Sequence, residues 1–502
     1  MTESLMERFS GFVAAAKAEL DHPTDSVKLG DRVDELEKQS SFGQLVVETR
    51  STFRGDYHEA SNEHTWRRAV HNYFCQSGLY ARLANHEQVE TDKAFSAYCS
   101  AFESRETTTT YLVPIELASF GDRDMDFGDF RVRRFPTKEL EVILRNKLNA
   151  DFFPWAEISQ DDLRLLSEYW CIQATSFSAV ERIGPFYLHL RASVSDTILL
   201  GDDDELETQR RVWYSEHRDP VRSILLKLSL FDWSTSQDKR NLQIDLSQRE
   251  DWPSARHINI PFVLQASADP LSAPGTKPNF SELLTEEMFL EERGELVTTR
   301  ETWNHLSLTS ERTEEFKVFV REIGHTLDTM ERYDYRWSFM STALGYFSKA
   351  YFMAPGFEQM LWHITSLEAL LGEKGGGVSR RLSERIRSIC GDQGGDRYAA
   401  RFAEIYNLRN SIVHGGVGKG AVKAVHVLDA YLINRRIILW FLRVLRAMHV
   451  EVVKTGNQRD VPGREEILAF IDLDRNSRGD RRLQWLLNTF PDGFSDGGSQ
   501  AF

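Results

Sequence analysis

Apolar residues recur every three or four positions along most of this chain, which predicts a largely helical protein. The spacing is that of amphipathic helices over 1–50 and 59–104. The pattern then changes: 107–117 is rich in β-branched residues and 127–135 alternates, so both segments predict strands. The other elements expected before residue 266 are helices at 137–148, 204–215 and 219–230 and strands at 168–175 and 258–265.

A proline-rich segment, 266–279, separates this mixed region from a second helical one. It holds three prolines among small polar residues, which indicates a loop or linker. From Ser310 to about residue 450 the helical spacing is almost continuous, and further helices are expected at 464–472 and 480–489. The pattern therefore predicts a multidomain α+β fold that is mostly α, in which an acidic α+β N-terminal part precedes an all-α bundle.

The length of the chain indicates how this pattern divides into domains. A chain of 502 residues exceeds one ordinary core, and roughly two to four domains are expected. We expect an N-terminal helical region at 1–105 and a sensing or regulatory α+β domain at 106–308. An all-α domain at 309–490 and a disordered tail at 491–502 are expected to follow.

Thr137 is expected to be the N-cap of the helix predicted at 137–148.

Charge is distributed unevenly along the chain. The formal net charge of −15 argues against a protein that coats nucleic acid along its whole length. Residues 325–450 carry 17 Lys or Arg against 11 Asp or Glu, a net charge of +6, whereas residues 1–324 have a net charge of −19. The contrast is either ordinary variation between solvated faces, or an RNA-contacting module beside a region that repels RNA or binds something else.

Several features indicate a soluble cytoplasmic protein. The four cysteines are far apart and form no CxxC pair, so neither a zinc site nor a disulfide framework is indicated. The first twenty residues carry charges and no long apolar run, so we expect no signal peptide. The most apolar stretch, 437–448, is too short to span a bilayer and contains two arginines. We therefore expect a cytoplasmic location and no membrane partner.

The histidines of the first hundred residues give no metal site. His58, His64 and His71 lie near acidic residues, but spacings of six and seven residues are not those of a helical metal pair. They predict a solvated face. We expect neither a metal nor a cofactor anywhere in the chain.

Residues 402–416, FAEIYNLRNSIVHGG, combine an amphipathic helix with a polar end. Helical spacing predicts a core-facing stripe made of Phe402, Ile405, Leu408 and Ile412. Gly415 and Gly416 stop the helix where a left-handed cap is usual, which places His414 in the last turn or at the cap. The helix dipole favours a protonated imidazole there, which suits a residue that donates a proton near neutral pH.

Arg409 and His414 do not share a face of this helix by spacing alone. Five residues correspond to about 140° around the axis, so the two can meet only because the helix ends and the arginine side chain is long. Asn410 and His414, four residues apart, do share a face. The bare Arg-x4-His pattern is weak evidence, because 300–305 repeats it in a polar, loop-like stretch.

The surrounding segments make the pattern more specific. Before it come a helix containing ALGYFSKAY, an apolar helix with SLEALLG and its single carboxylate Glu368, and a basic amphipathic helix with RLSERI. Together with YNLRNSIVHGG, these motifs resemble the HEPN (higher eukaryotes and prokaryotes nucleotide-binding) superfamily, particularly its ApeA-like branch. The resemblance covers roughly residues 335–450. The family pattern is Arg, a polar residue, three residues and His, which here are Arg409, Asn410, Ser411 to Val413, and His414.

The resemblance implies a metal-independent endoribonuclease that acts as a homodimer, with two motif helices forming one composite cleft. His414 would take or give a proton while the RNA 2′-hydroxyl attacks the neighbouring phosphate, and Arg409 would stabilise the developing charge. Asn410 would orient the phosphate or His414. Glu368 holds Arg409 in place or is a solvated helix residue, and Tyr406 is expected to pack. The products would be a 2′,3′-cyclic phosphate and a 5′-hydroxyl.

One departure from the family bears on regulation. Some toxin-type members carry a tyrosine two residues after the histidine, which a partner modifies, and this chain has Gly416 there. By family analogy we expect a toxin-effector of bacterial antiviral (abortive infection) defence, whose N-terminal region senses a phage-derived or nucleotide trigger or restrains the nuclease. The alternative is a non-catalytic HEPN scaffold that binds a nucleotide or a protein partner.

Overall fold

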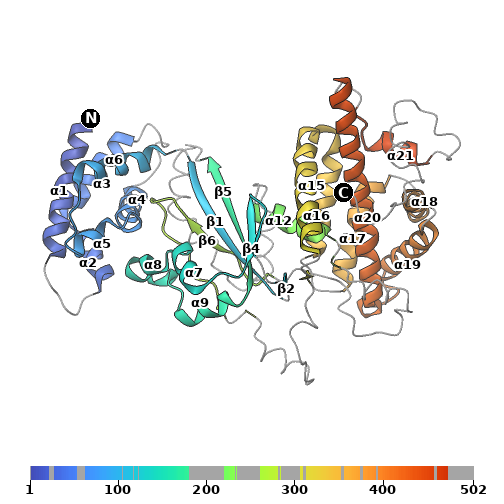
Figure 1. The fold of residues 1–502 in the computed structure, drawn as a ribbon, viewed down its shortest axis with the longest axis horizontal. Coiled ribbons are helices and arrows are strands. Elements are labelled where there is room, and N and C mark those ends of the chain that lie inside the picture. The colour runs from blue at the N-terminus through green and yellow to red at the C-terminus, as the bar shows by residue number, and fades with distance from the viewer. Residues whose placement is uncertain are drawn as a thin grey trace, which may run out of the picture. The chain divides into compact units, whose positions relative to one another are not determined.

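The computed structural model describes residues 2–21, 28–53, 63–104, 106–116, 118–121, 124–179, 220–231, 233, 260–280, 283, 306–308, 312–351, 356–373, 377–391, 394–456 and 461–472. The chain divides into two compact units, shown in Figure 1. The N-terminal unit comprises 1–116, 124–221 and 260–288, and the C-terminal unit comprises 117–123, 222–259 and 289–502.

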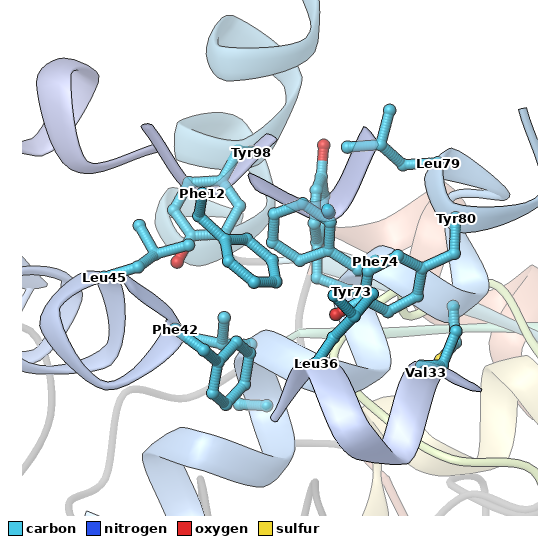
Figure 2. Packing of buried hydrophobic residues seen from close by; sticks show 14 of the residues in the cluster. Phe12, Val33, Leu36, Phe42, Leu45, Tyr73, Phe74, Leu79, Tyr80 and Tyr98 are labelled. Atoms are coloured by element: carbon cyan, nitrogen blue, oxygen red, sulfur yellow. The ribbon is translucent and has the colours of Figure 1, made fainter. Parts of the chain in front are cut away.

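The N-terminal unit begins with the helices that the apolar spacing predicts. They are α1 (Thr2–Leu20), α2 (Leu29–Leu36), α3 (Ser40–Phe53), α4 (Glu63–Gln76), α5 (Leu79–Ala84) and α6 (Thr91–Glu103). Their apolar faces enclose one aromatic-rich core (Figure 2). Phe12 meets Phe74 edge to face at 5.0 Å, and Tyr98 donates or accepts a 2.5 Å hydrogen bond with Thr49 Oγ1. Such aromatic contacts stabilise a core beyond the area that they bury.

A five-stranded antiparallel sheet with the order β3-β4-β5-β1-β6 follows these helices. Its strands are β1 (Glu106–Ile115), β3 (Met125–Asp126), β4 (Phe130–Arg133), β5 (Trp170–Ala179) and β6 (Leu264–Ser267). β1 pairs with β5 along its whole length, from Glu106 opposite Ala179 to Ile115 opposite Trp170. The strands predicted at 107–117, 127–135 and 168–175 are therefore confirmed, whereas that at 258–265 lies a few residues later in the chain and includes the start of the predicted loop.

The helix predicted at 137–148 is wrong as a single element. The structure has α7 (Thr137–Ile143) and α8 (Asn146–Phe152), separated at Arg145, whose φ of +52° is left-handed. The Arg145 guanidinium donates to the side chain and carbonyl oxygen of Gln76 in α4, and this tertiary contact accompanies the break. The short helices η2 (Pro154–Ala156) and α9 (Gln160–Ser167) complete this layer.

Thr137 is also not the N-cap of α7. The carbonyl of Pro136 accepts the first helical hydrogen bonds, from the N–H groups of Glu139 and Leu140, so Pro136 and not Thr137 is the N-cap residue. No side chain caps it. In contrast, Ser159 caps α9 by accepting a 3.1 Å hydrogen bond from the Asp162 N–H.

The C-terminal unit is built mainly from helices, as predicted from Ser310 onward. They are α12 (Pro220–Leu230), α15 (Thr313–Arg332), α16 (Asp334–Tyr351), α17 (Phe357–Leu371), α18 (Val378–Cys390), α19 (Gly395–Val413), α20 (Ala424–Thr455) and α21 (Arg464–Asp472). Two short parallel strands, β2 (Ala118–Ser119) and β7 (Leu306–Ser307), accompany them. Helices α15, α16, α17 and α20 lie side by side (Figure 1).

A buried polar network fixes how α16, α17 and α20 face one another. Ser366 Oγ lies 2.8 Å from the Ala343 carbonyl oxygen and 3.1 Å from Asn434 Oδ1. Asn434 Nδ2 lies 3.3 Å from His363 Nδ1, and complete burial lowers the pKa of His363 to about 3. His363 is therefore neutral near pH 7. Polar groups inside an apolar core favour the one helix register that pairs them.

Some predicted elements fall outside the described residues, namely the helices at 204–215 and 480–489 and the tail at 491–502. The helices predicted at 219–230 and 464–472 correspond to α12 and α21. Within the described parts of the chain, no helix combines the length and apolarity needed to span a membrane. The described part of the chain is mostly helical and has one small antiparallel sheet, as in an α+β protein.

Candidate functional site

The two glycines after His414 end helix α19 as their sequence position predicts. His414 is the C-cap residue, and Gly415 has a left-handed φ of +76°. The Gly416 N–H donates to the Ser411 carbonyl oxygen at 2.7 Å, and the Gly415 N–H donates to that of Ile412 at 3.1 Å. These two hydrogen bonds form a Schellman motif, which satisfies carbonyls that the helix end leaves open. The imidazole is thereby placed at a fixed, sharply terminated helix end.

A chain of polar contacts joins α17 to the last turns of α19. The Tyr406 hydroxyl donates a 2.8 Å hydrogen bond to Glu368 Oε1. The other carboxylate oxygen, Oε2, lies 3.9 Å from Arg409 Nη2, and the guanidinium lies over the Tyr406 ring at 5.5 Å from its centroid. Arg409 Nη1 donates to Asn410 Oδ1 at 3.0 Å. Four of the six predicted site residues, Glu368, Tyr406, Arg409 and Asn410, are thus brought together.

Arg409 keeps hydrogen-bonding capacity in this arrangement. Its Nε is buried and has no hydrogen-bond partner among the described residues. Its contact with Glu368, at 3.9 Å, is an ion pair at the outer limit of distance, and its side chain is 24% exposed. A guanidinium offers five N–H donors in a planar fork, a geometry that matches phosphate oxygens. The contacts therefore orient the Arg409 guanidinium but do not use all of its N–H donors.

Tyr406 is a buried residue that supports Glu368. Only 6% of it is exposed, and its ring packs on Phe402 in the same helix. Burial and the hydrogen bond to the Glu368 carboxylate raise the pKa of Tyr406 to about 12, so its hydroxyl stays protonated near neutral pH. It can donate to Glu368 throughout the physiological range. The contacts are those of a packing and orienting residue.

Two arginines fix the end of α17 that carries Glu368. The Arg464 guanidinium, from α21, donates to the carbonyl oxygens of Leu370 and Gly372. Arg385, a buried residue of α18, donates to the Leu371 carbonyl oxygen and pairs with Asp472 through Nε at 2.8 Å. Together they satisfy carbonyl groups at the C-terminal end of α17. Sequence reasoning missed this clamp, because nothing in the local pattern links α18 and α21.

His414 and Ser411 are not part of the Glu368–Arg409 cluster. Both side chains are exposed, and within the described residues neither makes a hydrogen bond or ion pair with Arg409. The predicted core stripe is also only half right: Phe402 and Ile405 are buried, whereas Leu408 and Ile412 are half-buried. The helix therefore leaves the core over its last two turns and projects His414 to the surface.

His71 contradicts the prediction of a solvated face. Its side chain is half-buried and only 16% exposed, with Nδ1 2.5 Å from Glu37 Oε1 and Nε2 3.4 Å from Cys75 Sγ. The Glu37 contact is bent and is better described as an ion pair than as a hydrogen bond. Burial alone would lower the pKa of His71, but Cys75 and Glu37 outweigh it and raise the pKa to about 10. Glu37 lies in the turn after α2 and His71 lies in α4, so sequence spacing could not reveal the contact.

Of the other two histidines and the second Arg-x4-His pattern named in the sequence analysis, the structure describes only His64. His64 is exposed, as predicted, and His58 lies outside the described residues, as does the second Arg-x4-His pattern at 300–305. Among the described residues, no group of three or more His, Cys, Asp or Glu side chains is arranged to hold a metal ion.

No family model matches this chain, and neither a curated protein nor a solved structure matches it. The features of this chain that indicate a function are therefore its sequence motifs and the contacts among Glu368, Tyr406 and Arg409, in the same helix that ends at the exposed His414.

Proposed function

We propose that the C-terminal unit is an endoribonuclease of the HEPN type, active as a homodimer. The observation that carries the proposal is the chain of contacts Tyr406–Glu368–Arg409, which orients an unsaturated guanidinium five residues before the exposed His414. A cation for the phosphate and an imidazole for proton transfer are the two groups that RNA transphosphorylation requires. No covalent nucleophile of the protein is needed, because the substrate supplies its own 2′-hydroxyl.

In the proposed reaction the 2′-oxygen forms a bond to phosphorus and the bond from phosphorus to the 5′-oxygen breaks. One His414 imidazole takes the proton of the 2′-hydroxyl, and the partner's His414 gives a proton to the leaving 5′-oxygen. Arg409 binds the non-bridging oxygens, whose charge increases in the transition state. Asn410, which accepts a hydrogen bond from Arg409, orients the guanidinium or the phosphate. The products are a 2′,3′-cyclic phosphate and a 5′-hydroxyl.

The homodimer follows from the single Arg409–His414 pair in each chain, which makes only half of a symmetric cleft. The exposed position of His414 and of the neighbouring Val413, which is 55% exposed, is compatible with a second copy covering this helix end. We extend the proposal to a toxin-effector of bacterial antiviral defence, with the N-terminal unit as sensor or restraint. That extension rests on family analogy.

The experiment that tests the activity compares RNA cleavage by the wild type, His414→Ala and Arg409→Ala, each checked for an unchanged melting temperature. Loss of the proton-transfer group should slow cleavage by about 10²- to 10⁴-fold, and loss of the arginine by a comparable factor. Arg397→Ala is the matched control, since Arg397 is an exposed arginine of the same helix. If a folded His414→Ala variant cleaved RNA at the wild-type rate, the catalytic role assigned to His414 would be wrong.

The same cleavage assay, applied to the wild type, distinguishes the enzyme from a non-catalytic scaffold. Within the described residues His414 makes no hydrogen bond or ion pair with Arg409, and this observation favours the scaffold. A scaffold would bind nucleotide or RNA with no cleavage by the wild type at any protein concentration. We expect cleavage, and we expect it to persist in EDTA, because none of the proposed roles is assigned to a metal.

A further inference from the structure

Helix α21 contacts α17 at the turn that carries Glu368. Arg464, the first residue of α21, donates through Nε to the Leu370 carbonyl oxygen at 3.0 Å and through Nη2 to that of Gly372. The same Nη2 lies 3.5 Å from the carbonyl oxygen of Glu368. The last turn of a helix leaves its carbonyl groups without N–H partners in the helix itself. One guanidinium therefore spans the C-terminal turn of α17, including the backbone of Glu368.

The opposite end of α21 is also anchored. Asp472, its last residue, accepts hydrogen bonds of 2.8 Å from Nε and 2.5 Å from Nη2 of Arg385 in α18. A guanidinium and a carboxylate that pair through two hydrogen bonds define one relative orientation. The residues of α21 that are buried between its two ends are Ile467, Leu468, Phe470 and Ile471. The helix is therefore held along its whole length, and the backbone position of Arg464 is fixed with it.

The backbone at the end of α17 has little room to adjust. The Gly372 N–H donates to the Glu368 carbonyl oxygen at 2.8 Å, and a Cβ at residue 372 would lie 2.5 Å from that oxygen. A contact this close excludes any side chain larger than the hydrogen of glycine. The chain therefore leaves α17 in one tight turn, and Arg464 binds the carbonyl groups of this same turn.

The position of this turn determines where the Glu368 carboxylate lies. Oε1 accepts the Tyr406 hydrogen bond at 2.8 Å, and Oε2 is 3.9 Å from Arg409 Nη2, near the limit for an ion pair. A small shift of the turn would therefore break the second contact. We propose that Arg464 is a positioning residue, which fixes the last turn of α17 so that Glu368 orients the Arg409 guanidinium. This inference rests on the proposed ribonuclease function and adds a residue outside the segment 335–450 that resembles the HEPN superfamily.

A double-mutant cycle tests whether Arg464 acts through Glu368. Single-turnover RNA cleavage is measured for the full-length wild type, Arg464→Ala, Glu368→Gln and the double variant. Arg464→Ala should slow cleavage by about tenfold, because a small displacement of a catalytic group lowers the rate steeply. In the Glu368→Gln background the same change should slow cleavage by less than about twofold. Arg435→Ala is the matched control and should leave the rate unchanged, since Arg435 is also half-buried and also donates to a helix-end carbonyl, that of Leu230.

A measurement that does not need cleavage separates this inference from the proposed function. In protein labelled with fluorotyrosine, the fluorine resonance of Tyr406, identified by its loss in Tyr406→Phe, should shift in folded Arg464→Ala. If it shifts but the wild type cuts no RNA, Arg464 positions Glu368 and the ribonuclease function fails. An unchanged resonance overturns the inference, and so do losses of rate that simply add in the cycle.

A second substitution covers the case in which Arg464→Ala unfolds. Arg464→Lys keeps the positive charge but not the planar fork of donors, so it should still slow cleavage by about threefold or more. It should also shift the fluorine resonance of Tyr406. A folded Arg464→Lys variant with wild-type cleavage and an unchanged resonance overturns the inference.

Discussion

At the residue scale, the contacts of Tyr406 distinguish two roles that this residue could have: orienting Glu368, or transferring a proton. Its hydroxyl donates to Glu368 at 2.8 Å, and Glu368 in turn lies 3.9 Å from Arg409. If Tyr406 only orients the carboxylate, its hydroxyl touches no reacting atom. If instead Tyr406 transferred a proton, its raised pKa of about 12 would make it an acid and not a base near neutral pH. The contacts favour the orienting role.

We therefore predict that Tyr406→Phe slows RNA cleavage only several-fold and lowers the free energy of unfolding by about 1 kcal/mol, the usual value of one hydrogen bond. Single-turnover cleavage rates and urea unfolding measure the two effects. Tyr398→Phe, which changes another tyrosine of α19, is the control. A loss of rate as large as that of His414→Ala would mean that Tyr406 takes part in the chemistry.

The half-buried ion pair of Glu37 and His71 predicts a pH dependence in the N-terminal unit. The pKa of His71 is raised to about 10 in the folded protein, so the stability that this group contributes is complete below its ordinary pKa of 6.5 and is lost as pH rises through 10. His71→Gln should therefore destabilise the protein more at pH 6 than at pH 10. Melting curves followed by circular dichroism at the two pH values measure the difference, and an equal loss at both would contradict the ion pair.

Sequence reasoning reached individual residues only where a local rule decided their position. It placed His414 at the helix end because two glycines follow it, and the structure agrees. It could not predict that Glu37 contacts His71, or that Tyr406 contacts Glu368, because the members of each pair lie more than thirty residues apart in the chain. Such contacts depend on how helices pack, which the periodicity of one segment does not specify.

At the scale of elements, periodicity predicted most helices and strands, and tertiary contacts account for the exceptions. The strand β1 was predicted because β-branched residues dominate it. The single helix predicted at 137–148 is divided at Arg145, whose guanidinium binds Gln76 in α4. No rule of local propensity anticipates a left-handed arginine in an otherwise helical pattern.

The C-terminal end of helix α19 leads to a prediction at the scale of secondary-structure elements. Gly415 has a φ of +76°, a conformation that a residue with a Cβ adopts at a cost. Gly415→Ala should lower the free energy of unfolding by about 1 kcal/mol, because alanine is strained at this φ. It should also reduce cleavage, because the substitution disturbs the Schellman motif that positions His414. Gly420→Ala is the matched control, since a Cβ there meets open space and Gly420 has no positive φ. Equal effects of the two substitutions on cleavage would contradict a positioning role for this helix end.

At the scale of the whole molecule, the proposed mechanism requires two copies of the chain. Val413 and Val417, which flank His414, are 55% and 44% exposed. We predict that Val413→Glu weakens dimerisation at least tenfold and lowers activity in proportion to the dimer lost, because a charge would enter the interface. Val142→Glu, at a valine of the N-terminal unit that is 76% exposed, should change neither. Light scattering measures the oligomer, and a fully active monomer would contradict the composite cleft.

The chemistry at the ends of the cut RNA tests the central claim most directly. The account predicts fragments that end in a 2′,3′-cyclic phosphate and begin with a 5′-hydroxyl, because the ribose 2′-hydroxyl is the nucleophile. DNA of the same sequence should stay intact, and a single 2′-deoxy substitution at the scissile nucleotide should block cutting there alone. Mass spectrometry of the fragments identifies both ends. Fragments that carry 5′-phosphates would show that water attacked, and the roles assigned to His414 and Arg409 would be wrong.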